Sequence, residues 1–256
     1  MTLVLAIKLF ASPALIGLAS LAGKRWGPNI AGLMGGLPLV GGPVVLALWL
    51  AHGGDFAADV ARAAPAGVWA NIVYMLLVGY ASARWAWLVA IPVGWLGYLA
   101  TCLLIDTSGL ADALWLGLLV LPGLWLAATR WLPKPVAPPR PVHLPRIELI
   151  ARMGAASALV LSLTAAADLF GPSLTGVFAG APVAATVIPA FTFANSGRDA
   201  LLLALRGFLT GLMGFTVFFL VLGHGAGPFG PWAAIPAVVA GIAVGLFATL
   251  LARRAA

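Results

Sequence analysis

A stretch of twelve residues occurs twice in this sequence, first at 27–38 and again at 171–182. Both copies read G-P-x-[I/L]-x-G-x-x-x-G-x-P, and corresponding positions lie 144 residues apart. The same offset continues without a gap on both sides. It matches further pairs of glycines, prolines and charged residues, including Gly53 and Gly197, Asp55 and Asp199, Arg62 and Arg206, Gly79 and Gly223, and Pro92 and Pro236. We therefore interpret the chain as an internal duplication, in which one structural unit occurs twice.

The composition of the chain predicts that lipid, rather than water, surrounds it. Hydrophobic residues make up 62% of the 256 residues and charged residues only 8%, whereas soluble domains carry about 25% charged residues. A chain with so few charged residues could not form a water-facing surface, so we expect a polytopic membrane protein. The single cysteine, Cys102, excludes an internal disulfide and a cluster of thiolate metal ligands.

Nine apolar runs are each long enough to cross a bilayer, which takes about 20 residues. They lie near 3–22, 28–51, 60–81, 85–105, 109–131, 148–168, 172–194, 201–222 and 231–252. The repeat offset maps the first four runs onto the last four and leaves the fifth unpaired. Because four helices return the chain to its starting side and the fifth crosses once more, the second unit runs upside down relative to the first. The sequence therefore predicts an all-α membrane protein of nine transmembrane helices in an inverted 4+1+4 repeat.

This layout divides the chain into three parts. Residues 1–107 form the first four-helix repeat, and 147–256 form the second, inverted repeat. Between them, 108–146 provide the linker helix and a proline-rich loop.

The positions of the basic residues predict the orientation of the spans. Nine spans place ten of the fourteen lysines and arginines in loops on one side: Lys24, Arg25, Arg84, Arg130, Lys134, Arg140, Arg146, Arg198, Arg253 and Arg254. Basic loops stay in the cytoplasm, so we expect the N-terminus outside and the C-terminus inside, in a bacterial inner membrane. The net charge of +7 is then explained by the basic loops on one side of the membrane, and it does not indicate that the protein binds nucleic acid.

Two families resemble this chain. The layout of four spans, a linker span and four inverted spans is similar to that of fused, two-domain fluoride channels, a likeness of architecture. The residues Ile30-Ala31-Gly32-Leu33, followed by Pro38 and His52, resemble the GlpM-like family of small four-span bacterial membrane proteins. This second resemblance implies a duplicated form of such a protein and brings no catalytic residues.

Each copy of the repeated motif places a proline about ten residues into a predicted span, which is about 15 Å deep and close to the bilayer midplane. A proline there removes a backbone hydrogen bond, and the freed polar groups need a partner or a water-lined cavity. Two such breaks related by inversion indicate a central binding site. Its candidate residues are Asn29, Gly35, Gly36, Pro38, Ser173, Gly180 and Pro182. The alternative is that Gly32-x-x-x-Gly36 and Gly176-x-x-x-Gly180 only allow close helix packing.

Four basic residues lie inside predicted spans rather than in loops. We expect Lys8 and Arg152 to extend towards the headgroups. Arg62 and Arg206 each follow an aspartate by seven residues, on one helix face, and are candidates to attract an anion at the solute site. The sequence shows no aspartate or glutamate that we expect to be buried and to couple transport to protons or sodium.

The absence of several motifs narrows the function. There is no H-E-x-x-H, Walker loop or histidine cluster in the sequence, so we expect no enzyme activity, catalytic residue, metal or cofactor. We expect a transporter of a small solute, preferably an anion, through a site between the second and seventh spans. A passive channel and a non-transporting scaffold or assembly subunit of an envelope enzyme are the alternatives. The expected partners are the lipid bilayer and a solute or ion, and the sequence leaves a homo-oligomer open.

The predicted orientation can be tested with reporters fused to the C-terminus. Because the last basic loop is predicted to be cytoplasmic, a fluorescent protein that folds only in the cytoplasm should be active there, and alkaline phosphatase should be inactive. The reverse pattern would contradict the predicted cytoplasmic C-terminus.

Overall fold

The computed structural model describes residues 10, 12–37, 49, 53–110, 113–137, 146–167 and 181–255. Within these ranges every regular element is a helix. The elements are α2 (Ser12–Trp26), α3 (Pro28–Gly36), α5 (Gly54–Ala81), α6 (Trp87–Thr107), α7 (Leu114–Leu126), the π-helix η2 (Ala127–Trp131), α8 (Arg146–Ala167), α10 (Val183–Phe229), the 3-10 helix η3 (Gly230–Ala233) and α11 (Ala234–Ala255). The prediction of an all-α protein is therefore confirmed for the described part of the chain.

Four helical stretches are long and apolar enough to cross a membrane: Gly54–Ala81, Trp87–Thr107, Leu114–Trp131 and Val183–Leu251. The last contains both α10 and α11 and is longer than one crossing. The described residues contain four candidate spans, so they do not confirm the nine separate spans predicted from the sequence. In particular, α3 has nine residues and is about 13 Å long, which is too short to cross a hydrocarbon core of about 30 Å.

The long helix α10 is divided by a single residue, Gly197, whose backbone angles are φ 83° and ψ −176°. Gly53, which precedes the first residue of α5, has φ 90° and ψ 174°. This combination of angles is open essentially only to glycine. The two glycines are related by the repeat offset, so the chain starts α5 and the second part of α10 with the same backbone conformation. We call residues 183–196 the first arm of α10 and residues 198–229 its second arm.

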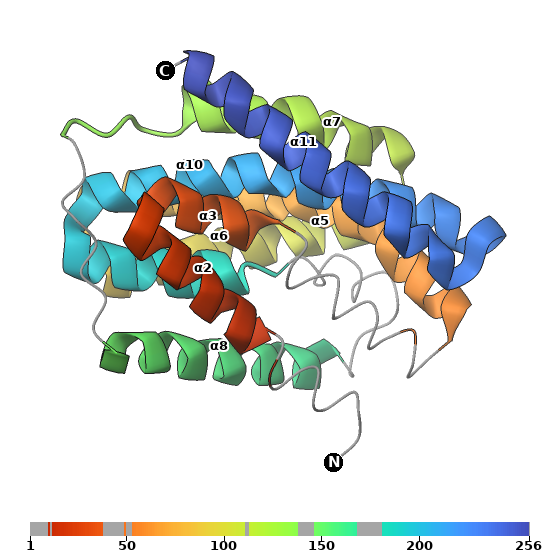
Figure 1. Cartoon of the computed structure of the whole chain (residues 1–256), viewed down its shortest axis with the longest axis horizontal. Coiled ribbons are helices and arrows are strands. Elements are labelled where there is room, and N and C mark those ends of the chain that lie inside the picture. The colour runs from red at the N-terminus through yellow and green to blue at the C-terminus, as the bar shows by residue number, and fades with distance from the viewer. Residues whose placement is uncertain are drawn as a thin grey trace.

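The second arm of α10 and α5 form the centre of the fold and run antiparallel (Figure 1). The start of α5 lies beside the end of α10, where the Arg62 guanidinium reaches the Gly223 carbonyl. The end of α5 lies beside the start of the second arm, since a Cβ on Gly79 would be 3.6 Å from Leu202. Helices α6 and α7 pack on α5, and α11 packs on α10, whereas α8 lies along the lower edge beside α2.

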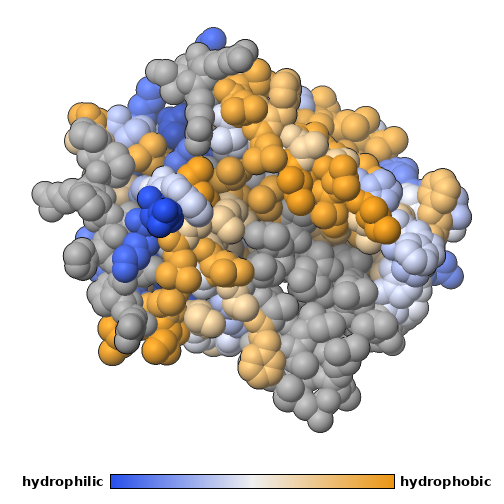
Figure 2. Space-filling view, in the orientation of Figure 1, coloured by the Kyte–Doolittle hydropathy of each residue, from blue (hydrophilic) through white to orange (hydrophobic). Residues whose placement is uncertain are grey.

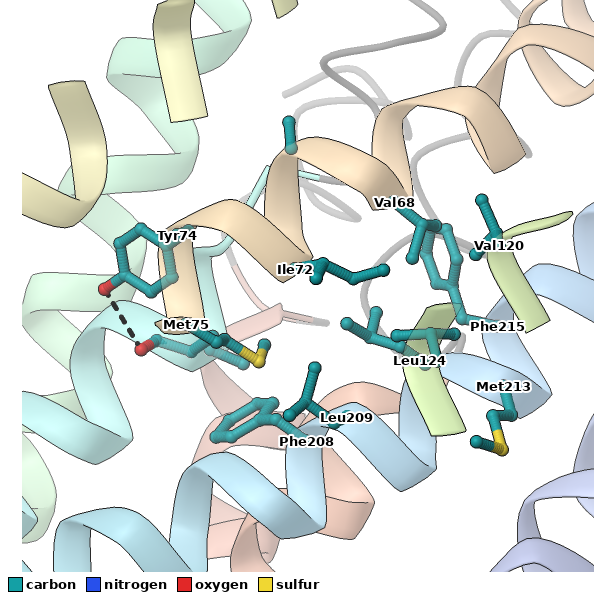
Figure 3. Close-up of a cluster of buried hydrophobic side chains, with 14 of the residues drawn as sticks. Val68, Ile72, Tyr74, Met75, Val120, Leu124, Phe208, Leu209, Met213 and Phe215 are labelled. Atoms are coloured by element: carbon teal, nitrogen blue, oxygen red, sulfur yellow. Dashed lines mark hydrogen bonds between the residues drawn. The ribbon is translucent and has the colours of Figure 1, made fainter. Parts of the chain in front are cut away.

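Apolar side chains from three helices fill the space between α5, α7 and α10 (Figure 3). This cluster is continuous and fully buried; its members include Val68, Ile72 and Met75 of α5, Val120 and Leu124 of α7, and Phe208, Leu209 and Phe215 of α10. The outer faces of α6, α7 and α11 are also apolar but exposed, as at Leu96, Leu104, Leu118, Val239 and Phe247. Figure 2 shows such residues as a broad band where α11 lies. Exposed apolar faces of this extent fit contact with lipid.

Helix α3 packs against the second arm of α10 through glycines, with the two helices in backbone contact. A Cβ on Gly32 would lie 1.9 Å from the Ala204 carbonyl oxygen, and one on Gly207 would lie 2.0 Å from that of Asn29. Gly36 and Gly211 meet in the same way one turn further on. The packing interpretation of Gly32-x-x-x-Gly36 therefore holds for the first copy of the motif. The second copy, Gly176-x-x-x-Gly180, lies outside the described residues.

Replacing Gly207 with alanine should lower the free energy of unfolding by about 1–3 kcal/mol, because its methyl group would overlap backbone atoms of α3. Gly154→Ala is the matched control, since Gly154 lies inside α8 with no atom within 4 Å of the added Cβ. That control should be neutral or stabilising, because alanine favours helix over glycine. Thermal unfolding in detergent measures both. Equal stability of the two variants would contradict the backbone contact.

Candidate functional site

Both predicted helix breaks coincide with the end or the start of a helix. Helix α3 ends at Gly36, and the next residue, Leu37, is extended with φ −70° and ψ 162°. Helix α10 begins at Val183, directly after the buried Pro182, whose φ −77° and ψ 52° are not helical. Of the other residues predicted for this site, Pro38, Ser173 and Gly180 lie outside the described residues.

The end of α3 and the start of α10 lie next to each other. A Cβ on Gly35 would lie 3.4 Å from that of Ala184, and 2.3 Å from the ring of Phe208. Gly35 therefore lies beside the first turn of α10, whereas Gly36 lies against Phe208, Gly211 and Leu212 of the second arm. The half-buried Asn29 lies two turns away along α3, where its backbone carbonyl faces Gly207. We call the contact between the end of α3 and the start of α10 the break site.

A small polar cluster occupies the first turn of α10 beside the break site. The Trp95 indole donates a hydrogen bond to Thr186 Oγ1 at 3.0 Å. The Tyr74 hydroxyl lies 3.1 Å from Thr186 Oγ1 and donates to the Ala185 carbonyl at 3.2 Å. The Tyr74 hydroxyl has one proton, which it donates to the Ala185 carbonyl. Thr186 therefore donates its hydroxyl proton to the Tyr74 oxygen, and each hydroxyl is both a donor and an acceptor. Figure 3 shows Tyr74 reaching from α5 towards α10.

Sequence reasoning missed most of this cluster. Tyr74 is a polar residue within a predicted span, but Trp95 and Thr186 resemble ordinary residues of apolar helices. Only the spatial meeting of α5, α6 and α10 marks them as a group.

Arg206 binds backbone carbonyls at the end of η2. Its guanidinium donates to the carbonyl of Ala128, to that of Leu132 at 2.8 Å and to that of Pro133 at 3.2 Å. The last carbonyls of a helix have no partner within the helix, and a positive charge there is favourable. Arg206 therefore caps η2.

Arg62 is an exposed residue paired with Asp59. The closest atoms of the two side chains are 2.7 Å apart, and their side chains are 44% and 55% exposed. Arg62 Nε also donates to the Gly223 carbonyl at 3.2 Å. The described contacts thus place Arg62 and Arg206 at opposite ends of the α5–α10 pair. They do not bring either arginine to the break site.

Arg152 contradicts the expectation that it extends towards the headgroups. Its side chain is only 3% exposed and forms an ion pair with Glu148, one turn earlier on α8, at 2.6 Å. A longer contact of 3.5 Å reaches Ser20 on α2, and the guanidinium lies 5.3 Å from the centre of the Phe191 ring on α10. Burial is tolerated because the opposite charge compensates the loss of water. The i,i+4 spacing of Glu148 and Arg152 is the signal that could have identified the pair.

Glu148 contradicts a second expectation, that no carboxylate is buried. The residue is 8% exposed and lines a cavity of about 420 Å³ between α6, α8 and the first arm of α10. The remaining walls are mostly apolar: Trp87, Ile147, Ala151, Ala190, Phe191, Ala194 and Asn195. We call this the α8 cavity. Among the described residues, no three histidine, cysteine, aspartate or glutamate side chains are grouped to hold a metal ion.

Breaking the buried ion pair should be much more harmful than breaking the exposed one. Glu148→Gln should lower the free energy of unfolding by about 3–5 kcal/mol, because it leaves the buried Arg152 charge uncompensated. The control Asp59→Asn, which breaks the exposed pair with Arg62, should change it by about 0–1 kcal/mol. Unfolding measurements in the same detergent compare them. Similar losses in the two variants would contradict burial of the α8 pair.

The two family resemblances seen in the sequence, to GlpM-like proteins and to fused fluoride channels, rest on a short motif and on a layout of spans. Neither supplies a residue of the break site or of the α8 cavity. Comparison with known proteins supplies none either, since no protein family model, curated protein or solved structure matches the chain.

Proposed function

We propose that this protein is a transporter that moves a small solute across a bacterial inner membrane at the break site. The observation that carries the proposal is that the end of α3 and the start of α10 meet there, with Gly35 against Ala184. Helix ends inside a membrane expose backbone groups that are otherwise unsatisfied. Transporters use such ends, together with nearby hydroxyl groups, to bind solutes. Tyr74 and Thr186 provide those hydroxyls.

The proposal includes the inverted repeat of nine spans predicted from the sequence. Two features support it. The repeat-related Gly53 and Gly197 share one backbone conformation at a helix start, which Gly27 before α3 also adopts. The helices that follow them, α5 and the second arm of α10, lie antiparallel in the centre, as an axis in the membrane plane requires.

The close packing at the break site favours a carrier over a passive channel. The ring of Phe208 fills the position where a Cβ on Gly35 would stand, at 2.3 Å, so the contact is sealed on this side. A carrier needs such a seal, because it opens to one face at a time. A channel needs a continuous path.

The preference for an anion is not part of this proposal. It depended on Arg62 and Arg206, and these side chains already bind Asp59 and backbone carbonyls. Solute recognition is placed instead on the hydroxyls and the indole at the start of α10. Their donor protons are used within the cluster, but the Tyr74 and Thr186 oxygens each keep a lone pair for a solute that donates a hydrogen bond.

Transport can be tested by the swelling of proteoliposomes in concentrated solutions of sugars, amino acids, organic acids and amines. Thr186→Val should slow uptake of the transported class about tenfold or more, because it removes a hydroxyl that bridges Tyr74 and Trp95. The matched control is Thr216→Val in the same helix, whose buried hydroxyl bonds only to its own helix at the Leu212 carbonyl. It should transport within about twofold of the wild type.

Two outcomes would overturn the proposal. Equal uptake by wild type and Thr186→Val, with both proteins folded, would remove the break site from the pathway. No uptake of any class by the wild-type protein would favour the scaffold function instead.

A further inference from the structure

The Glu148–Arg152 pair presents only its negative member to the α8 cavity. Both hydrogen bonds from Arg152 within the pair are accepted by one carboxylate oxygen, Oε1, at 2.6 and 3.1 Å. Within the described residues, no hydrogen bond reaches the other oxygen, Oε2. Glu148 lines the cavity, whereas Arg152 lies behind it against Phe191 and Ser20. Glu148, and not Arg152, is therefore the charged residue that a ligand in the cavity meets.

The other walls of the cavity suit an apolar body that carries a hydrogen-bond donor. Trp87 and Phe191 are aromatic, and Ile147 with three alanines adds aliphatic surface. Aromatic faces attract cations, and because the Phe191 ring already lies against Arg152, Trp87 is the face that a ligand cation would use. Asn195 adds an amide, whose oxygen accepts and whose nitrogen donates hydrogen bonds. A volume of about 420 Å³ lies within the range of small-molecule sites.

We propose that the α8 cavity binds an ammonium group on an apolar body. The ammonium donates to Glu148 Oε2, while Oε1 keeps its bonds to Arg152, so the buried pair persists when the ligand is bound. An anion finds no free donor on the pair, since Arg152 directs its nitrogens to Glu148 and Ser20. Two sources share this chemistry: a free amphipathic amine and the headgroup of an aminolipid. The inference does not rest on transport, because a resident lipid would use the same cavity.

The test is calorimetric titration of the whole protein in nanodiscs of phosphatidylcholine, which has no ammonium proton to donate. The probes are 4-phenylbutylamine, the neutral 4-phenylbutanol and the anionic 4-phenylbutyrate, which share one body. The amine should bind about tenfold or more tightly than the other two, since a hydrogen bond to a charged group distinguishes it. Equal binding of the alcohol or the acid would overturn the proposal.

Variants locate the binding without disturbing the ion pair. Ala151→Phe should weaken amine binding at least about tenfold, because an exposed residue of the cavity wall becomes a bulky side chain. The control is Ala155→Phe, one turn later on α8, where the residue is also exposed but does not line the cavity. It should bind like the wild type. Undiminished binding to Ala151→Phe would place the amine elsewhere and refute the assignment.

Aminolipid in the nanodisc distinguishes the two sources. If phosphatidylethanolamine weakens the binding of 4-phenylbutylamine in wild type but not the residual binding in Ala151→Phe, a lipid headgroup occupies the cavity. If it has no effect on the wild type, the ligand is a free amine. Both results uphold an ammonium site, and neither depends on the outcome of the swelling assay.

Discussion

Direct backbone contact between α3 and the second arm of α10 is the interaction on which the rest of the architecture depends. In lipid, helices gain nothing from burying apolar side chains against each other rather than against acyl chains, so close packing has to hold them. Gly32 and Gly36 against Gly207 and Gly211 provide that packing. The contact also holds the end of α3 beside α10. Because α3 lies so close to α10, its last residues reach Phe208 and Ala184, and the break site forms there.

The charged residues show how a chain with few charges uses them inside a membrane. Arg206 caps the carbonyls at the end of η2, and Arg62 bonds to the end of α10. Arg152 and Glu148 neutralise each other between α8, α2 and α10. In each case the charge joins segments that are distant in sequence. In this protein the partners of each of these arginines therefore identify it as a structural cross-connection between helices.

The sequence allowed the helical class and helices apolar enough to cross a membrane to be predicted, because low charge and helix-forming residues act locally. The end of α3 at Gly36 and the start of α10 at Val183 lie beside the two prolines of the repeated motif. The sequence did not allow the partner of each helix to be predicted. The glycine motif of α3 packs on Gly207 and Gly211, which lie outside the motif. The hydrogen bond between Trp95 and Thr186 could not be predicted, because it depends on the packing of α6 against α10. The prediction that Arg152 extends towards the headgroups is wrong. It followed the repeat position that Arg152 shares with Lys8, whereas the partner of Arg152 is Glu148 on its own helix. Tertiary contacts of this kind have no signature within one span.

The bend at Gly197 divides α10 into two arms, and the shorter one borders both sites. Among the described residues, no atom lies within 4 Å of where a side chain on Gly197 would begin. Hydrogen bonds hold both sides of the bend: Arg198 and Asp199 bind Ser82 and the Val136 amide, and Ala185 and Thr186 bind Tyr74 and Trp95. The first arm, 183–196, is about 21 Å long. A rotation of about 10° at Gly197 would swing its far end, at Pro182, by nearly 4 Å on this length. Such a swing would part Ala184 from Gly35 and displace Phe191 and Ala194 from Glu148 together, because the first arm forms a wall of both sites.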